Sequence, residues 1–424
     1  MKVMVSGSGG RENALVWKIG KSDLVDAIIC VPGNSGTEDV KKCTNVPISI
    51  TDIDGLVGLA TKENPDLVVV GPEGPLVEGL ADKLRECGIP VFGPSKRGAL
   101  LEGSKEFAKK LMKKYGIKTA DYEIFTDPNK AKEYILKNGL SKVIKADGLT
   151  GGKGAYVYKS IEEAFKAIDD MMVHGIYGEA GRKIIIEDRL VGQEVSYQIL
   201  TDGKTFIPLE LVEDHKQLLD GDQGPNTGGM GALSPLRIAP SLEKRMREIA
   251  DRFVCAMETE GIDYQGVCYI GFMIVNGELY VLEINCRFGD PETQVLMPRM
   301  KSDIVPILLA CTNGTLDQHK IEWDPRPAVC VVLAARGYPD NPEKGKVIHG
   351  LESPFLKVMD DTFIFHAGTI KKDNIILTNG GRVLCVVAIG AHIKDSAKKA
   401  YGVVRGLNFE GMQYRKDIPR GLVT

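Results

Sequence analysis

The stretch that decides the fold is Glu283-Ile284-Asn285-Cys286-Arg287-Phe288-Gly289-Asp290-Pro291-Glu292-Thr293-Gln294. It follows the apolar run Leu279-Tyr280-Val281-Leu282, which is typical of a β-strand. Because successive strand side chains point to opposite faces, Glu283, Asn285 and Arg287 share one face if the strand continues. Carboxylate and amide oxygens suit Mg²⁺, and an arginine fork suits a phosphate or carboxylate. The alternative is an exposed strand end with a turn at Asp290-Pro291.

Length and composition indicate a globular protein of several domains. The chain has 424 residues, too many for one ordinary core, so roughly three domains are expected. Its net charge of −3 argues against general nucleic-acid binding, which needs a basic face. The nine cysteines contain no C-x-x-C pair, which favours reduced thiols and a cytoplasmic location. No signal-peptide core is present, and no apolar run approaches the roughly 18 residues of a membrane span.

The first hundred residues alternate between strand and helix patterns. Such alternation is typical of a parallel α/β sheet, and we assign this domain to residues 1–103. Ligands bind at the carboxyl ends of parallel strands, where the chain places Gly7-Ser8-Gly9-Gly10, Pro32-Gly33-Asn34 and Gly71-Pro72-Glu73. The expected strands are 2–6, 27–31, 66–70 and 90–92, and the expected helices are 11–19, 52–62 and 76–87.

The remaining chain predicts a central domain over 104–327 and a separate C-terminal α+β domain over 328–424. A boundary is indicated by Trp323-Asp324-Pro325-Arg326-Pro327. Helix 105–115 is followed by a small unit with strands 122–125, 142–145, 155–158 and 183–187 and helix 161–172. Antiparallel strands and helix 242–260 are expected over 194–312, then strands 328–335 and 382–389 and helix 397–404.

The first glycine loop, Gly7-Ser8-Gly9-Gly10-Arg11-Glu12, opens a predicted helix. This arrangement directs backbone N–H groups and a positive helix end at an anion. A dinucleotide fingerprint needs a third glycine where Glu12 stands, and an acidic residue where the chain reads Gly33-Asn34. A monophosphate assisted by Arg11 therefore fits better than NAD. A plain turn into a helix is the alternative.

A second glycine loop, Gly151-Gly152-Lys153-Gly154, follows the strand that carries Lys145. It is not a Walker A loop, because Gly154 stands where that motif needs Ser or Thr. A glycine hairpin with Lys153 at its tip can still cover phosphates with N–H groups and an ammonium. Lys145 has apolar neighbours, and a buried lysine needs an anion. Lys105 and Lys153, taken singly, could simply be solvated.

Two further segments carry groups that fit a nucleotide or a small substrate. Glu187 ends an apolar strand, and its carboxylate could accept from adenine or ribose, although such a residue usually lies at the surface. Asp214-His215-Lys216 precedes the glycine-rich loop 224–231, where a ligand could approach the backbone closely. Asp214 could hold a substrate ammonium and Lys216 a carboxylate or phosphate. Alternatively, the loop is only a surface connection.

Together these segments resemble the phosphoribosylamine–glycine ligase family of the ATP-grasp superfamily. The resemblance runs from Met1 to Asp417, and its most specific parts are 224–231 and 283–294. It implies an N-terminal α/β domain, a small mobile lid over about residues 122–190, an ATP-grasp domain and a C-terminal α+β domain. The other matching segments are 7–12, Pro32-Gly33-Asn34, Gly71-Pro72-Glu73, 145–154, Asp214-His215-Lys216 and Gly380-Gly381-Arg382-Val383-Leu384.

The resemblance also implies an activity and a role for each polar segment. ATP, glycine and 5-phosphoribosylamine would be the substrates, Mg²⁺ or Mn²⁺ the metal, and glycyl phosphate the intermediate. No nucleic-acid or membrane partner is expected, and the chain is expected to be a monomer or a weak dimer. The implied residues are Lys105, Lys145, Lys153, Glu187, Leu190 and Glu194 for ATP; Glu283 and Asn285 for metal; Asp214, Lys216 and Arg287 for catalysis; and Gly9, Gly10, Arg11, Asn34, Glu73, Asn226, Thr227, Asp290 and Glu292 for substrate.

The chain departs from the family pattern at two positions. Asn13 stands where a histidine is usual, and it keeps hydrogen bonding but cannot become cationic. If that histidine holds the phosphate, we expect weaker substrate affinity. Gln217 stands where a basic residue commonly follows Asp-His-Lys. In addition, the strand Cys268-Tyr269-Ile270-Gly271-Phe272-Met273-Ile274 has no carboxylate, so Glu283 is expected to be the only protein carboxylate on the metal.

Three other functions are compatible with parts of this pattern. Another ATP-grasp ligase would use a different acid or amine, and amino-acid selectivity distinguishes it. A nucleotide-binding regulatory protein would lack turnover, but the complete set Lys105, Lys145, Glu283, Asn285 and Arg287 argues against such a protein. A dehydrogenase is disfavoured by Glu12.

Overall fold

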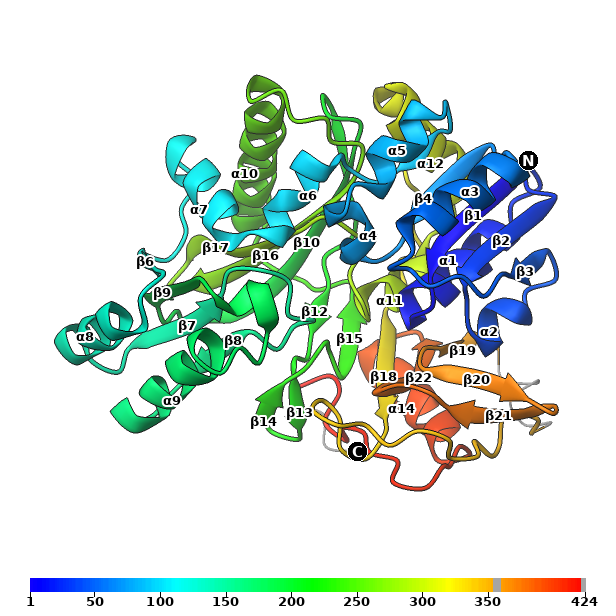
Figure 1. The fold of residues 1–424 in the computed structure, drawn as a ribbon. Coiled ribbons are helices and arrows are strands. Elements are labelled where there is room, and N and C mark those ends of the chain that lie inside the picture. The colour runs from blue at the N-terminus through cyan, green and yellow to red at the C-terminus, as the bar shows by residue number, and fades with distance from the viewer. Residues whose placement is uncertain (354–359, 421–424) are drawn as a thin grey trace.

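The N-terminal part of the computed structural model, which describes residues 1–353 and 360–420, is built on a parallel sheet (Figure 1). Its strand order is β3-β2-β1-β4-β5. The inner strands are mostly apolar because helices pack on both faces of the sheet. The four strands expected from the sequence are present, and the short β3 is an addition. The strands are β1 (Lys2–Gly7), β2 (Ala27–Pro32), β3 (Cys43–Asn45), β4 (Leu67–Val70) and β5 (Val91–Phe92).

The helices of this part require one correction. The single helix expected over 76–87 is two helices, α4 (Glu73–Val77) and α5 (Leu80–Glu86). Between them Gly79 adopts φ +89°, a left-handed conformation that interrupts a helix and that glycine adopts without a side-chain clash. Helix α1 (Gly10–Gly20) begins at the first glycine loop as expected, and it packs against α11. The others are α2 (Ser35–Glu38), α3 (Ile53–Glu63), α6 (Lys96–Gly103) and α7 (Lys105–Lys114).

Residues 122–188 form a small unit with a hydrophobic core of its own, which we call the lid. Its four-stranded sheet has the order β6-β9-β7-β8. Ala131, Ile144, Ile168 and Ile186 are among the buried side chains that pack only with one another inside this unit. The strands agree with the sequence prediction, whereas helix α8 was not expected. The elements are β6 (Tyr122–Phe125), α8 (Pro128–Asn138), β7 (Lys142–Ala146), β8 (Ala155–Val157), α9 (Ile161–Met172), the 3-10 helix Gly178–Gly181 and β9 (Ile184–Asp188).

The central part is a second antiparallel sheet, of order β11-β10-β16-β17, which carries the stretch that begins at Glu283. The long helix α10 (Pro240–Thr259) covers this sheet close to the range predicted. Helices α11 (Glu292–Arg299) and α12 (Ile304–Asn313) were missed, because their apolar runs lack a clear helical period. The strands are β10 (Gln193–Thr201), β11 (Phe206–Pro208), β16 (Gly266–Val275) and β17 (Glu278–Asn285), and a 3-10 helix covers Leu316–Gln318.

The C-terminal sheet draws strands from two distant regions of the chain. Its order is β12-β15-β18-β22-β19, and β12 (Glu213–Asp214) and β15 (Gly231–Ser234) precede the boundary expected at 327. The boundaries at 103/104 and 327/328 therefore stay predictions. The remaining elements are β13 (Gln217–Leu219), β14 (Gln223–Asn226), β18 (Ala328–Ala334), β19 (Thr362–His366), β20 (Thr369–Lys372), β21 (Ile375–Thr378), β22 (Arg382–Ile389) and α14 (Ile393–Val404).

These parts share hydrophobic cores, which fix their relative positions. One core joins strand β1 and helix α1 to α11, α12, β18 and β22, so it spans the N-terminal, central and C-terminal parts. The expected fold class is confirmed: an N-terminal parallel α/β part, a central part with a small lid, each built on an antiparallel sheet, and a C-terminal α+β part. Within the described ranges, no helix has the length and apolar character needed to cross a bilayer.

Candidate active site

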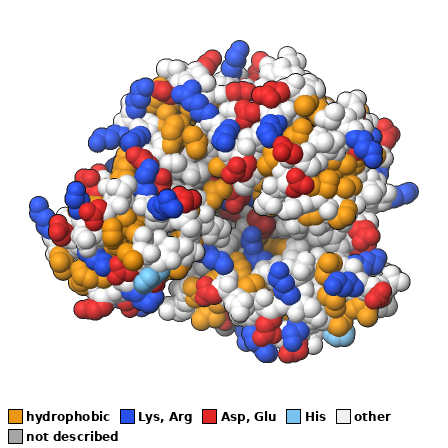
Figure 2. Space-filling model, in the orientation of Figure 1, with side chains coloured by type: hydrophobic (Ala, Val, Ile, Leu, Met, Phe, Trp, Pro, Cys, Tyr) orange, Lys and Arg blue, Asp and Glu red, His pale blue; other side chains and the backbone are white. Residues whose placement is uncertain are grey.

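A cavity of about 330 Å³ lies where the lid, the central sheet and the N-terminal and C-terminal parts meet. Figure 2 shows the surface hollowed at this junction, with charged side chains near the opening. The cavity walls come from strands β7 and β17, helix α7 and the glycine hairpin that follows β7. The cavity is thus formed by elements from distant segments of the chain, and its walls carry acids, lysines and arginines in close proximity.

One wall is the carboxyl end of β17. Glu283 and Asn285 both line the cavity, and a register shift between β16 and β17 lies just before Glu283. The strand ends at Asn285, so the regular alternation does not reach Arg287. Arg287 nevertheless lines the same cavity and donates from Nη2 to Asn285 Oδ1 at 3.2 Å. The three residues are therefore brought together as expected, although not by an unbroken strand.

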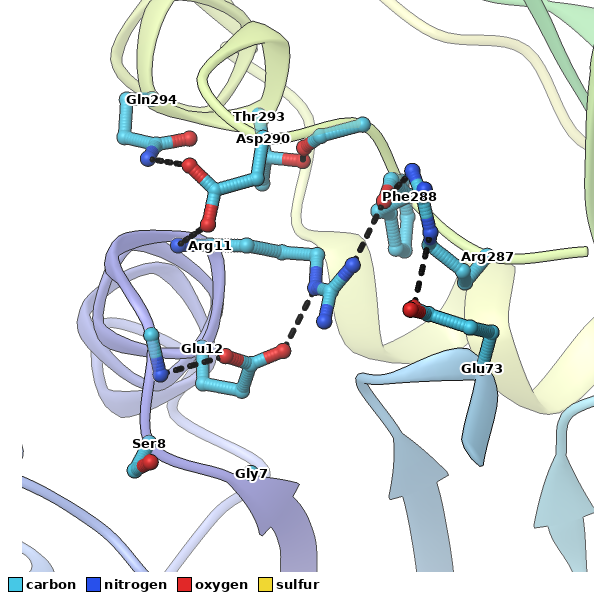
Figure 3. A network of polar contacts seen from close by, with 12 residues as sticks. Gly7, Ser8, Arg11, Glu12, Glu73, Arg287, Phe288, Asp290, Thr293 and Gln294 are labelled. Carbon is cyan, nitrogen blue, oxygen red and sulfur yellow. Dashed lines mark hydrogen bonds and ion pairs between the residues drawn. The ribbon is translucent and has the colours of Figure 1, made fainter. Parts of the chain in front are cut away.

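Arg287 lies between two acids of the N-terminal part. Its Nε is 3.2 Å from Glu73 Oε2, and its Nη2 is 2.9 Å from Glu102 Oε1 (Figure 3 draws the Glu73 contact). Burial would raise the pKa of Glu73, but Arg287 and Arg11 outweigh burial and lower it. Glu102 also accepts from the backbone N–H of Cys286 at 2.8 Å. These contacts fix the guanidinium against Asn285.

Lys145 and Glu187 of the lid form a buried cluster with Lys109 of helix α7. Glu187 Oε1 is 2.5 Å from Lys145 Nζ, and its Oε2 is 2.6 Å from Lys109 Nζ. Burial would raise the pKa of Glu187, but the two lysines lower it. Burial lowers the pKa of Lys109, whereas Glu187 and Glu283 overcome burial and raise that of Lys145. Both lysines line the cavity while Glu187 lies behind them.

Lys216 and Lys105 complete a positive environment around Glu283. Lys216 Nζ lies 3.7 Å from Glu283 Oε1 and 3.3 Å from Asp214 Oδ2. Burial alone would raise the pKa of Glu283, but Lys216, Lys145 and Lys105 lower it to about 2. Glu283 is therefore ionised at any physiological pH. Its side chain keeps 41% of its surface exposed, so it remains able to bind a ligand from the cavity.

Asp214 is a carboxylate in the cavity wall with an unsatisfied oxygen. Its Oδ1 is buried and has no hydrogen-bond partner among the described residues, although Asp214 lines the cavity. Burial, together with the carboxylates of Glu292 and Glu194, outweighs Lys216 and raises the pKa of Asp214 to about 7. A buried oxygen of this kind is costly unless a donor reaches it. The arrangement fits a cationic or N–H-bearing ligand.

At the first glycine loop, carboxylates of the protein occupy the helix N-terminus (Figure 3). Glu12 accepts from the Gly9 N–H at 2.6 Å and pairs with Arg11 Nε at 2.5 Å. Asp290 Oδ2 accepts from the Arg11 N–H at 3.4 Å. Gly10 packs so closely on α11 that a Cβ would lie 2.6 Å from Gln294 Nε2. A dinucleotide fingerprint has a glycine at position 12, which leaves the helix N-terminus free for a ligand. Here the Glu12 side chain occupies that space.

Both departures from the family pattern have structural partners. Asn13 is buried and accepts from the backbone N–H of His366 at 2.7 Å, which links α1 to the C-terminal part. Gln217 donates from Nε2 to Asn226 Oδ1 at 3.3 Å, across the hairpin of β13 and β14. Neither Asn13 nor Gln217 is among the described residues that line the cavity.

The predicted site residues, taken together, divide into two groups. Those that line the cavity are Arg11, Glu73, Lys105, Lys145, Asp214, Lys216, Thr227, Glu283, Asn285, Arg287, Asp290 and Glu292. Those outside its described lining are Gly9, Gly10, Asn34, Lys153, Glu187, Leu190, Glu194 and Asn226. Asn34 caps α2 and donates to the carbonyls of Ser8 and His366, and Lys153 donates to the carbonyl of Pro339. Both therefore have contacts within the protein.

Sequence reasoning missed several lining residues, among them Glu102, Lys109, Tyr269 and Arg382. Lys109 lies one helical turn after Lys105 on α7, so the i, i+4 spacing could have found it. Tyr269 donates to Glu292 Oε1 at 2.6 Å from the adjacent strand β16. Arg382 lies in a matched motif to which no role had been given. Glu102 gave no sequence signal.

Comparison with known proteins identifies the family. Models of the N, ATP-grasp (A) and C domains of phosphoribosylglycinamide synthetase match residues 1–102, 103–293 and 328–420. The chain belongs to the phosphoribosylglycinamide synthetase family. It is 47% identical to the phosphoribosylamine–glycine ligase of Ralstonia nicotianae and 45% identical to that of Neisseria meningitidis serogroup B, over 99% of this chain and 98% of each relative. A crystal structure of the Thermotoga maritima ligase is 37% identical with a TM-score of 0.85, covering 98% of this chain and all of that one.

For this member of the synthetase family, we predict that Glu187→Gln destabilises the protein. The substitution leaves Lys109 and Lys145 buried without their counter-charge, and breaking a buried pair in this way typically costs about 3–5 kcal/mol. Urea unfolding measures the change in the free energy of unfolding. Glu123→Gln, on the exposed face of β6 beside β9, is the control and should alter stability little. Equal stability of the two variants would contradict the importance of this cluster.

Proposed function

We propose that this protein joins glycine to 5-phosphoribosylamine at the expense of ATP. The products are glycinamide ribonucleotide, ADP and phosphate, and the reaction is a step of purine biosynthesis. The observation that carries the proposal is the ionised Glu283 surrounded by Lys105, Lys145 and Lys216, with the unpartnered Asp214 oxygen in the same cavity. Membership of the synthetase family and full-length similarity to curated ligases support it.

The chemistry explains why such a cavity needs cations. An amine does not displace oxide from a carboxylate, so the glycine carboxylate first attacks the γ-phosphorus of ATP. Glycyl phosphate and ADP form, and the amine of phosphoribosylamine then attacks the acyl carbon and releases phosphate. The first step brings one anion toward another. Lys145 and Lys216 line the cavity and would offset that repulsion without reorganisation.

Glu283 and Asn285 fit a divalent metal ion. Both offer hard oxygen ligands, and Glu283 is held ionised with much of its side chain exposed. Among the described residues, no cluster of three or more His, Cys, Asp or Glu side chains forms a closed metal cage. A metal with few protein ligands is typical of Mg²⁺ that also binds nucleotide phosphates. When bound, Mg²⁺ or Mn²⁺ would neutralise phosphate charge.

We assign the nucleotide to the side of the cavity nearest the lid. Lys105 and Lys145 would bind phosphate oxygens, and Gly151 and Gly152 of the hairpin line the same side. Glu187 would act by holding Lys145 in place. The neighbouring Leu190 and Glu194 are proposed for the adenosine end because they continue the chain from β9 into β10.

We assign glycine and phosphoribosylamine to the side nearest the N-terminal part. Asp214 would accept from the glycine ammonium through Oδ1, which no described protein donor satisfies. Arg11, Glu73 and Asp290 line that side and would meet the ribose phosphate and hydroxyls. Glu292 would hold the hydroxyl of Tyr269 beside them. The other residues proposed to shape this side are Gly9, Gly10, Asn34, Asn226 and Thr227.

The proposal also includes the cellular location, the oligomeric state and the partners of the enzyme. All nine cysteines are free thiols, which fits a cytoplasmic enzyme. We propose that it acts as a monomer or weak dimer on small molecules, without a nucleic-acid or membrane partner.

The direct test measures ADP formed by purified protein with Mg²⁺, glycine and freshly generated phosphoribosylamine, with each omitted in turn. We expect ADP only when both substrates are present, and we expect alanine not to replace glycine. ADP that depends on glycine alone would indicate a different amine acceptor. Measurable ATP binding without ADP would support a regulatory protein and contradict the ligase.

Arg287→Ala should lower kcat by about 10²–10³, because one preorganised donor typically contributes that much. The change also releases Asn285 and leaves Glu73 and Glu102 without their cation. Steady-state assays measure the effect, and thermal unfolding verifies that the variant is folded. Arg287→Lys retains the positive charge without the planar fork, so its kcat should lie between those of the wild-type and Arg287→Ala enzymes. Near-normal turnover in a folded Arg287→Ala protein would rule out the proposed role.

Glycine binding should depend on pH through Asp214, whose pKa is raised to about 7. The ionised form accepts from the ammonium, so kcat/KM for glycine should rise about tenfold per pH unit below 7 and level off above it. The assay varies glycine at saturating ATP and phosphoribosylamine. Asp214→Asn should give a lower value without that rise. A variant that keeps the full pH dependence would assign the titration to another group.

A further inference from the structure

The C-terminal part holds one residue of the glycine-rich loop, Gly228, by both its backbone N–H and its carbonyl. Gly228 lines the cavity, and its backbone N–H donates to the Tyr338 hydroxyl at 2.9 Å. Its carbonyl accepts from Arg382 Nη1 at 2.6 Å. A Cβ on Gly228 would lie 3.0 Å from Arg382 Cζ, which is tighter than ordinary contact, so glycine suits this position. Two side chains from a distant part of the chain therefore fix the orientation of the two peptide groups that flank Gly228.

Arg382 also holds a second wall of the cavity. Its Nη1 donates to the carbonyl of Asp290 at 2.6 Å and lies 3.4 Å from Asp290 Oδ1. The backbone of Arg382 is itself fixed in β22, where its carbonyl accepts from the Gly368 N–H at 2.8 Å. Asp290 in turn accepts from Gln294 Nε2 at 2.6 Å (Figure 3). One guanidinium thus ties the loop of Gly228 to the turn of Asp290.

Thr227, which precedes Gly228, connects the loop to Lys216. Thr227 donates to the carbonyl of Lys216 from both its N–H, at 2.8 Å, and its Oγ1, at 2.7 Å. Thr227 Oγ1 also accepts from the Gly229 N–H at 3.0 Å. The backbone position of Lys216 is therefore set by the same loop that Tyr338 and Arg382 hold.

The glycine hairpin of the lid contacts both this loop and the residue that follows Tyr338. Lys153, at its tip, donates from Nζ to the carbonyl of Pro339, next to Tyr338. A Cβ on Gly152 would lie 3.5 Å from the Thr227 carbonyl oxygen, so the hairpin packs on the loop. Tyr177 donates to the Lys153 carbonyl at 2.8 Å and braces the hairpin from inside the lid.

We propose that Tyr338 and Arg382 are positioning residues for the ligation reaction, and that the Pro339 carbonyl anchors the lid hairpin on the loop they hold. The inference rests on the proposed ligase function. Lys216 then lies correctly beside Asp214 and Glu283 only while the C-terminal part holds residues 227–229. A small displacement of such groups lowers rates strongly, and an imperfectly covered site admits water to the acyl phosphate.

The experiment compares two single substitutions and their combination in the full-length protein. Tyr338→Phe removes one hydroxyl acceptor, and Lys153→Met removes the lid contact while keeping a long side chain. The controls are Tyr401→Phe, whose hydroxyl donates to the Arg415 carbonyl elsewhere in the C-terminal part, and Lys159→Met on the exposed lid surface. The measurements are KM for glycine, kcat, and the number of ADP molecules formed per ligated product.

We expect Tyr338→Phe to raise KM for glycine about 3- to 10-fold, the range that corresponds to one hydrogen bond. ADP per product should rise above the wild-type ratio in Tyr338→Phe and in Lys153→Met. The double variant should show less than the product of the two single effects, because both substitutions act on one loop. The two control variants should keep the wild-type KM and ratio.

Three outcomes would overturn the inference: a Tyr338→Phe enzyme with wild-type KM and ratio, single effects that multiply in the double variant, or a Tyr401→Phe enzyme that behaves like Tyr338→Phe. A fall in thermal stability with unchanged KM and ratio would assign Tyr338 a structural role and also reject it. The proposed function fails separately, by absence of substrate-dependent ADP from the wild-type protein.

Discussion

The structure depends on pairing several charges that its cavity buries. Lys109 and Lys145 share Glu187, and Arg287 lies between Glu73 and Glu102. Lys145 and Glu187 both belong to the lid, whereas the other pairs join different parts of the chain. An ion left without its partner in such surroundings costs several kcal/mol. The contacts of Lys109 with Glu187 and of Arg287 with Glu73 and Glu102 connect the N-terminal part to the lid and to the segment after β17. Charge pairing and the shared hydrophobic cores therefore hold the same parts of the chain together.

Two carboxylates that line the cavity are left incompletely paired. Asp214 retains an oxygen with no donor among the described residues, and Glu283 is ionised with its side chain partly exposed. The pKa values of these two carboxyls move in opposite directions, because burial prevails at Asp214 and the lysines prevail at Glu283. One acid is thus suited to an ammonium near neutral pH and the other to a permanent cation. Both carboxylates lie beside Lys216 Nζ, at 3.3 and 3.7 Å, so two acids with opposite pKa shifts are neighbours in the cavity.

Much of the fold follows from the sequence, because strands such as 27–31 and 382–389 are apolar runs with clear ends. The split between α4 and α5 was missed, since a glycine in a helical pattern does not reveal a positive φ. The gathering of Glu283, Asn285 and Arg287 was foreseen from a regular strand, yet a bulge and two glutamates bring Arg287 to the cavity. Glu102 and Arg382 could not be found, because their roles depend on contacts between residues far apart in sequence.

The glycine-rich loop explains why a C-terminal part with no reacting group still matters to the site. Gly224 and Gly229 adopt positive φ, and such a loop loses much conformational freedom when it becomes ordered. Its own side chains offer little packing to offset that loss. Hydrogen bonds from Tyr338 and Arg382 supply the missing restraint from a rigid sheet. The C-terminal strands thereby order a loop that has no room for side chains at some of its glycines: a Cβ on Gly229 would lie 2.4 Å from Pro291 Cδ.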